Sequence, residues 1–217
     1  MILASGSYIG KGAYSIADAA RIVHAPYTTV RGWLNPEHGI IPRRFGREIV
    51  SFVELMEIHF IKMFMDEGVH PRTIHAAAQT AANLFKTDYP FAVKRFDTDG
   101  RDIFATLARQ DGGAEMIEDL KRGQFVFKTI MRPFFKKLDY NRSEIARYWP
   151  MGKRGRVTLD PDRQFGQPID HESGIPTKAL YQATRAGKGQ SFQQVALWFD
   201  IPEAAVRAAV GFEKSLA

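Results

Sequence analysis

The feature that most constrains this 217-residue chain is a helix–break–helix pattern over residues 14–34. Ser15 can cap the first helix, and Asp18 can return a bond to the Ser15 backbone N–H, which would make a capping box. Apolar residues recur at helical spacing on both sides of a break at His24-Ala25-Pro26. They are Ile16, Ala19, Ala20 and Val23 before the break, and Val30, Trp33 and Leu34 after it. The pattern predicts a helix-turn-helix.

The second helix of this pattern begins with small and polar side chains. In a helix-turn-helix, the residues at the start and outer face of the second helix contact base edges and phosphates. That position is occupied here by Tyr27, Thr28, Thr29 and Arg31. The sequence therefore predicts these four residues as DNA contacts, at or near the bases.

A basic segment follows directly behind this motif. Ile40 and Ile41 precede it, and Ile49 and Val50 follow it, so two short strands around a glycine-containing tip would form a β-hairpin wing. Its basic residues are Arg43, Arg44 and Arg47. We expect these arginines to contact the DNA backbone, because such contacts position a protein on the duplex and make its binding salt-dependent.

The net charge of +6 is unevenly distributed along the chain. Residues 1–50 and 94–156 are basic, whereas residues 51–93 and 157–217 are acidic or near neutral. A basic block is compatible with a polyanionic partner, but for residues 94–156 a solvated face is an equally good interpretation. There are no cysteines, no apolar stretch long enough for a membrane span and no signal-peptide pattern at the start. We expect a cytoplasmic protein with no membrane partner.

The rest of the chain predicts a mainly α fold with small β elements, of the α+β class. Alternation on both sides of Asp97-Thr98-Asp99-Gly100 indicates a central hairpin. Helices are expected over 51–67, opening with Ser51 and ended by Gly68, and over about 71–85 and 123–138, with a kink or break at Pro133. Residues 109–114 are expected to form a loop, and short strands are expected at 145–149 and 156–159. The tail predicts three helices, over 177–184, from Ser191 and from about Glu203, of which the last two again resemble a helix-turn-helix.

Nothing in the sequence forms a catalytic or metal-binding signature. His59, His70 and His75 lack the carboxylate or cysteine spacing that would complete a metal site. The carboxylates near His171, and the pair Asp160 and Asp162, lie in loops where such residues usually form turns. We therefore expect no enzyme activity, no cofactor and no metal.

Residues 13–85 resemble the DNA-binding head of MerR-type regulators, with a helix-turn-helix, an arginine-containing wing and a helix pair. His24 and Pro26 depart from that pattern, which has a glycine in the turn and a hydroxyl cap before the second helix. Further segments are similar to a group of VapB-type antitoxins that join a MerR-like head to a small C-terminal helical domain of formerly unknown function. They are 51–58, 75–78, 90–92, 95–101, 147–150, 165–169 and 174–213.

This resemblance implies three parts: a winged head over 1–88, a central α+β region over 89–166 and a dimerising or partner-binding domain over 167–217. It implies an antitoxin that neutralises a PIN-like ribonuclease toxin and represses its own promoter, binding a palindromic operator as a homodimer. An alternative is a ligand-responsive MerR-like regulator with no toxin partner. In that alternative residues 91–217 would bind a small molecule, and an aromatic-rich cavity around Phe125, Phe127, Phe134, Trp149 and Trp198 would support it.

Overall fold

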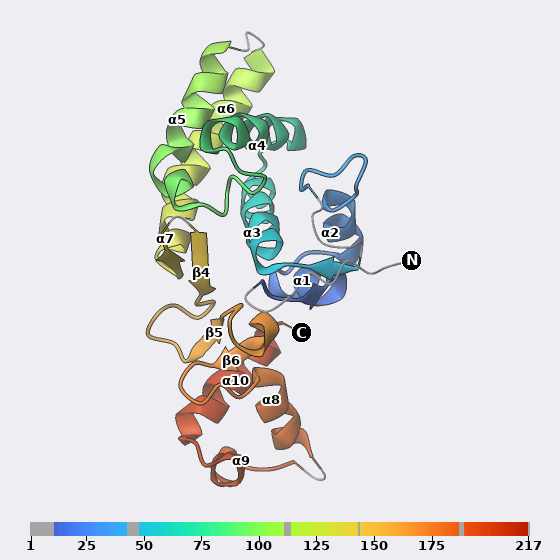
Figure 1. The fold of residues 1–217 in the computed structure, drawn as a ribbon, viewed down its shortest axis with the longest axis vertical. Helices are drawn as coiled ribbons and strands as arrows, with labels where there is room; N and C mark the ends of the chain where they lie inside the picture. The colour runs from blue at the N-terminus through green and yellow to red at the C-terminus, as the bar shows by residue number, and fades with distance from the viewer. Residues whose placement is uncertain (1–10, 43–47, 111–113, 143, 187–188, 217) are drawn as a thin grey trace.

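The structure is a computed structural model, and it describes residues 11–42, 48–110, 114–142, 144–186 and 189–216. The fold is mainly helical with small antiparallel sheets, which confirms the predicted class. Figure 1 shows an elongated molecule: α5 and α6 lie at one end, α8 to α10 lie at the other, and α1 and α2 lie beside α3. Among the described residues, no helix is both long enough and apolar enough to cross a membrane.

The first two helices form where the sequence predicts them. Ser15 caps α1, because its side chain accepts a bond from the Asp18 N–H (3.0 Å) and its hydroxyl donates to the Asp18 carboxylate (2.7 Å). The chain reverses at His24, whose φ of 54° is left-handed, and α2 then begins directly after Pro26. The elements of this part are β1 (Tyr14–Ser15), α1 (Ile16–Ile22), α2 (Tyr27–Trp33) and β2 (Ile49–Val50).

Two longer helices, α3 (Phe52–Asp66) and α4 (Pro71–Phe85), match the predicted pair. A capping box opens α3: Ser51 Oγ accepts from the Glu54 N–H, and the Glu54 carboxylate accepts from the Ser51 N–H at 2.8 Å. The chain leaves α3 through Gly68, whose φ of +77° suits a residue without a Cβ. Pro71 at the start of α4 needs no hydrogen-bond partner there.

The expected central hairpin is wrong, because residues Lys94–Gln110 form one helix, α5. Its buried residues recur at helical spacing, and they are Phe96, Gly100, Ile103, Phe104 and Leu107. A Cβ on Gly100 would overlap the Phe127 ring, so this glycine allows close helix packing where a turn was expected. The dipeptide Asp99-Gly100, a sequence that usually indicates a tight turn, is here part of a contact between α5 and a neighbouring helix.

The buried aromatic pattern over 123–138 is helical up to Phe135, as predicted, whereas Leu138 already lies in a strand. It is divided into the end of α6 (Ala114–Val126), a π-helical turn η1 (Phe127–Met131) and α7 (Arg132–Phe135). The change in hydrogen bonding falls just before Pro133, which cannot donate to a carbonyl one turn back. Of the loop predicted at 109–114, the end residues belong to helices, because α5 runs to Gln110 and α6 starts at Ala114. Residues 111–113 lie outside the described residues.

A four-stranded antiparallel sheet, in the order β3-β4-β5-β6, joins this helical layer to the tail. The strands are β3 (Leu138–Asn141), β4 (Glu144–Tyr148), β5 (Val157–Leu159) and β6 (Pro168–Asp170), with a short 3₁₀ turn η2 (Gln164–Gly166) before β6. The strands predicted at 145–149 and 156–159 are thus confirmed to within a residue at each end. The register shifts between Asp139 and Tyr140, which marks a β-bulge.

The tail contains the three predicted helices. They are α8 (Thr177–Arg185), α9 (Phe192–Phe199), capped by Ser191, and α10 (Glu203–Ser215). Its core is a separate small cluster that includes Leu180, Val195 and Val206. By contrast, one continuous core reaches from Tyr14 to Leu159, so the head and the central region share their packing. The domain boundaries expected from the sequence stay predictions.

Candidate nucleic-acid interface

The outer face of α2 carries the residues predicted to contact DNA. Tyr27 is 47% exposed, and Thr28 and Arg31 are exposed, whereas Thr29 is half-buried. The opposite side packs Val30 and Trp33 into the core. Tyr27 and Arg31 are four residues apart, so they lie on the same side of the helix, one turn from each other. The structure therefore leaves an aromatic ring, a hydroxyl and a guanidinium accessible along one face.

A groove of about 500 Å³ runs beside this face, and Tyr27, Arg31, Asn35 and Glu48 are among the residues that line it. Asn35 Oδ1 accepts bonds from the backbone N–H groups of Glu37 (2.9 Å) and His38 (3.1 Å), which orders the turn after α2. Glu37 and Glu48 place carboxylates at the edge of the groove. Among the groove-lining residues that the structure describes, Arg31 is the one cation, and Glu37 and Glu48 are the two carboxylates.

The two segments expected to form the strands of the wing, residues 40–41 and 49–50, do not pair with each other. Ile41 is buried and its N–H donates to the Trp33 carbonyl (3.1 Å), so it closes the end of α2. Ile49 pairs with Ser15, and Val50 pairs with Tyr14, in place of the expected pairing with Ile40 and Ile41. The wing arginines Arg43, Arg44 and Arg47 lie outside the described residues. Their role remains a prediction.

A second feature, which no local sequence pattern indicates, is a set of polar contacts that joins β1 and α1 to η2 and α10. The Tyr14 hydroxyl donates to the Gly166 carbonyl (2.6 Å), and burial raises the pKa of that hydroxyl. On α1, Arg21 pairs with the buried carboxylate of Glu213 on α10 (3.4 Å), which also accepts a bond from Thr177 Oγ1 (2.5 Å). A small cavity of about 120 Å³ lies between these groups. The helix that supports α2 is therefore tied to the C-terminal helices.

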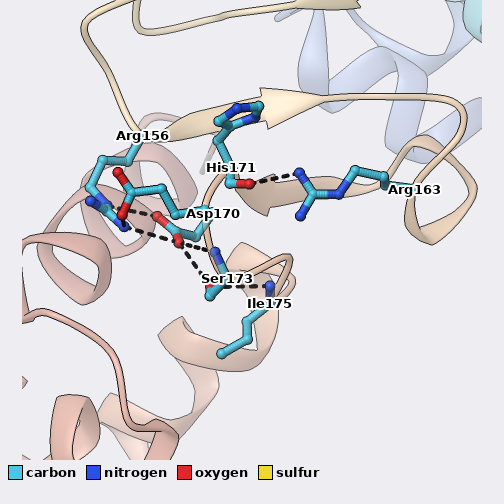
Figure 2. A network of polar contacts seen from close by, with 7 residues as sticks. Arg156, Arg163, Asp170, His171, Ser173 and Ile175 are labelled. Carbon is cyan, nitrogen blue, oxygen red and sulfur yellow. Dashed lines mark hydrogen bonds and ion pairs between the residues drawn. The ribbon is translucent and has the colours of Figure 1, made fainter.

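The loop carboxylates weighed as catalytic candidates are engaged in structural contacts, as Figure 2 shows for Asp170. Asp170 pairs with Arg156 at 2.7 Å and accepts bonds from the Ser173 N–H (2.9 Å) and hydroxyl (2.8 Å). Burial alone would raise the pKa of Asp170, but these donors outweigh it and lower the pKa. Arg156 also pairs with Glu172 (2.8 Å).

The neighbouring polar residues complete this network. Arg163 donates to the His171 carbonyl at 2.6 Å (Figure 2). The His171 ring packs against Trp149, with ring centroids 4.6 Å apart. Asp160 pairs with Arg147 at 2.7 Å and accepts from the Asp162 N–H at 3.0 Å. These contacts fix the sheet and the turn before α8, which agrees with turn roles for these carboxylates.

The histidines and aromatic residues do not gather into a ligand site. In the part of the chain that the structure describes, no three histidine or carboxylate side chains are grouped to hold a metal ion. His59 stacks on Phe134 at 4.6 Å, and burial lowers its pKa to about 3. Among the aromatic residues considered for a ligand cavity, Phe127 and Trp149 are buried whereas Phe125 and Trp198 are exposed. Figure 1 places their helices, α6 and α9, toward opposite ends of the molecule.

An exposed apolar patch lies on α9. Leu197 is 77% exposed and Trp198 is 55% exposed, although their neighbours Val195 and Ala196 are buried in the core of the tail. The helix itself, Phe192–Phe199, carries no charged residue. Adjacent exposed apolar side chains of this size are typical of protein contact surfaces.

These features define a mainly helical protein with two exposed surfaces. One is the outer face of the short helix α2, and the other is the apolar patch on α9. No model of a protein family matches the chain. It is 26% identical over 211 residues to a Mycobacterium tuberculosis protein named "Putative antitoxin VapB45", covering 84% of this chain and 86% of that protein. This similarity over most of both chains supports a distant relationship between them.

The fold agrees with a solved structure. The crystal structure of Rv2018 from Mycobacterium tuberculosis superposes with a TM-score of 0.74, covering 91% of this chain and 96% of that chain at 21% identity. The two chains therefore share a fold over nearly their whole lengths.

Proposed function

We propose that this protein is a DNA-binding antitoxin of a type II toxin–antitoxin module and acts in the cytoplasm. The observation that carries the proposal is its similarity, over most of both chains, to a protein named as an antitoxin. An antitoxin of this kind is a binding protein and needs no catalytic residues, so we assign the chain no enzyme activity.

We assign operator reading to α2. Tyr27, Thr28 and Arg31 are exposed on one face, and Thr29, which follows Thr28 in the chain, is half-buried. Arginine and threonine are common readers of base edges in the major groove. In a homodimer on a palindromic operator, two copies of α2 would lie about 34 Å apart, one turn of DNA. Arg43, Arg44 and Arg47 would hold the backbone beside this site.

We assign partner binding to the tail. A PIN-like ribonuclease toxin is the partner that an antitoxin of this type would neutralise, and Leu197 and Trp198 on α9 are available for it. Exposed tryptophan is a frequent energetic centre of protein interfaces. The contact of Arg21 with Glu213 would connect the partner-binding end to the helix that supports α2.

A DNA-selection experiment on the purified chain, followed by binding assays on the selected duplex, tests the operator proposal. Thr28→Ala and Arg31→Ala should weaken the selected duplex more than a scrambled one, by about 1–3 kcal/mol for each base-edge interaction that is removed. Lys214→Ala, an exposed cation on α10, is the matched control. Equal weakening on both duplexes would place Arg31 on phosphates, and absence of any selected sequence would contradict operator reading.

The wing arginines are tested by salt dependence. Replacing Arg43 and Arg44 with alanine should weaken binding to every duplex and reduce the salt slope by about 0.9 for each phosphate that is no longer neutralised. An unchanged slope would remove them from the interface.

Co-purification tests the toxin-binding proposal. A PIN-like nuclease encoded alongside should co-purify with the wild-type chain and with Lys214→Ala, but not with Leu197→Asp, because the new carboxylate would place a charge in the apolar patch on α9. If Leu197→Asp still retains the nuclease, the toxin binds to a surface other than α9.

A further inference from the structure

One helical segment outside the proposed operator site has an unusual charge pattern. Residues 121–137 contain six lysines and arginines and no aspartate or glutamate. They form the end of α6, the π-helical turn η1 and α7, which follow one another without a break. Residues 94–156 carry a net charge of +6, and the six cations of this segment equal that excess in number.

This segment has one buried side and one exposed side. Val126, Phe127 and Met131 pack into the main core. The exposed side, called here the basic face, consists of Lys121, Arg122, Phe125, Lys128, Thr129, Arg132, Pro133 and Lys136. From Lys121 to Arg132 the face extends about 17 Å, at roughly 1.5 Å per residue. Cations are therefore presented along the full length of one surface.

Most of these cations have no carboxylate partner. In the ranges that the structure describes, Lys121, Lys128 and Lys136 form no ion pair within 4 Å. The flanking carboxylates are engaged elsewhere. Asp119 accepts bonds from the His70 N–H and the Thr73 hydroxyl, and Asp139 pairs with Lys153 at 2.7 Å. The positive potential of the face is thus not neutralised by these neighbours.

The two arginines have partial partners. Arg122 donates to the Gly68 carbonyl at 2.8 Å, which is a neutral acceptor and leaves its charge in place. Arg132 lies near Asp97, where burial raises the pKa of the carboxyl and Arg132 opposes that rise. One exposed carboxylate, Glu118, lies at the amino-terminal edge of the face.

An aromatic ring stands among these charges. Phe125 is 61% exposed, although the next two residues, Val126 and Phe127, are fully buried. Its backbone carbonyl accepts a bond from Thr129 Oγ1 (2.7 Å), one turn further along. Exposed phenylalanine contributes little to the stability of its own fold, whereas an aromatic ring flanked by cations is the arrangement that binds unpaired bases.

We infer that the basic face binds single-stranded nucleic acid, with lysines on the phosphates and Phe125 stacked on a base. A duplex keeps its base faces inside the stack, so it offers phosphates to the lysines but no partner to the ring. A single strand offers both. The length of the face is sufficient for a few nucleotides, within the range of small single-strand sites. This site is separate from α2 and does not depend on operator binding.

Fluorescence anisotropy with labelled 12-nucleotide oligouridine and oligothymidine, against a 12-base-pair duplex, tests this site in the full chain. Phe125→Ala should weaken single-strand binding about five- to a hundredfold with little change in salt slope. The triple variant Lys121→Ala, Lys128→Ala, Lys136→Ala should weaken it and reduce the salt slope by about 2, at roughly 0.7 per phosphate. Lys214→Ala and Arg31→Ala should bind the single strands like the unmodified chain.

Several results would overturn the inference. One is the absence of single-strand binding at low salt, and another is a duplex bound as tightly as the single strands with no effect of Phe125→Ala. Binding to anionic phosphatidylserine vesicles without binding to either oligonucleotide would assign the face to a lipid surface. An equal weakening in Arg31→Ala would move the binding to α2. Thermal unfolding of each variant identifies any that fail to fold, and Phe125→Ala should fold because its side chain is exposed.

Discussion

Glu57 on α3 is a buried carboxyl with a structural task. Its Oε1 accepts bonds from the backbone N–H groups of Phe91 (2.7 Å) and Ala92 (2.8 Å), so it fixes the chain just before α5. Burial raises its pKa to about 8, although both hydrogen bonds favour the charged form. At neutral pH the protonated carboxyl therefore predominates, with one oxygen still accepting the two backbone bonds.

This shift makes stability depend on pH above about 6.5. An unfolded glutamate releases its proton near 4.5, whereas Glu57 in the fold holds it to about 8. The unfolded state binds fewer protons between those values, so Glu57 lowers stability as pH rises. Below 6.5 the buried neutral His59, with a pKa of about 3, acts in the opposite direction. From pH 6.5 to 8, the free energy of unfolding should therefore fall as pH rises, by on the order of 1 kcal/mol per pH unit and less steeply close to pH 8.

Urea unfolding of the wild-type protein and Glu57→Gln across this pH range measures the effect. Glutamine keeps an oxygen that can accept the bonds from Phe91 and Ala92 but does not ionise, so its profile should be nearly flat from 6.5 to 8. A variant that loses stability with pH as steeply as the wild type would rule out Glu57 as the group responsible.

At the scale of elements, the sequence predicted helices with strong periodicity and missed one with a competing turn signal. The pairs α1–α2 and α3–α4, and the three tail helices, follow from caps and apolar spacing that favour the same local structure. In α5 the segment Asp97–Gly100 imitates a hairpin turn. What decides the outcome is the packing of Gly100 against Phe127, a contact between residues far apart in the chain that local patterns do not contain.

The same glycine gives a sharp packing test. A Cβ at Gly100 would overlap the Phe127 ring, whereas nothing lies within 4 Å of one at Gly211 on α10. Gly100→Ala should therefore lose about 1–3 kcal/mol of stability through overpacking. Gly211→Ala should gain up to about 1 kcal/mol from helix propensity. Chemical denaturation of the two variants provides the comparison, and a stabilised Gly100→Ala would contradict the close α5–η1 packing.

The candidate DNA-binding face was largely predictable, because an exposed side of a short helix follows from its apolar stripe. The partial burial of Thr29 was not predictable, because it depends on how α2 packs on its neighbours. The contact of Arg21 with Glu213 was also beyond the sequence, as the two residues are 192 positions apart. Long-range pairs of this kind leave no spacing pattern.

On the scale of the whole molecule, α10 is joined to the rest of the chain by polar contacts and by a small apolar cluster of Val157, Phe212 and Leu216. Tyr14→Phe removes the hydroxyl bond to Gly166, worth about 1 kcal/mol, and Arg21→Ala removes a half-exposed partner of Glu213, worth up to about 1 kcal/mol. In the double variant, hydrogen exchange should accelerate in α8 and α10 and stay unchanged in α3.

Arg207→Ala is the control for this experiment, since Arg207 pairs with Glu203 inside α10 and lies over the Phe192 ring on α9, so both contacts are within the tail. It should leave exchange in the first turn of α8 as slow as in the wild type. Uniform acceleration across α3, α8 and α10 in the double variant would mean that the head and the tail unfold as one unit.

The pairing of Tyr14 with Val50 and of Ser15 with Ile49 brings both ends of a 37-residue stretch, 14–50, to one point. Of the residues between these two strands, the structure describes 16–42 and 48, and they include α1 and α2. Such a stretch is suited to exchange as a cassette: a chimera could receive residues 16–48 of a related protein and acquire its base preference. The transplant would have to retain an arginine at position 21, because this position holds the recipient's C-terminal helix in place.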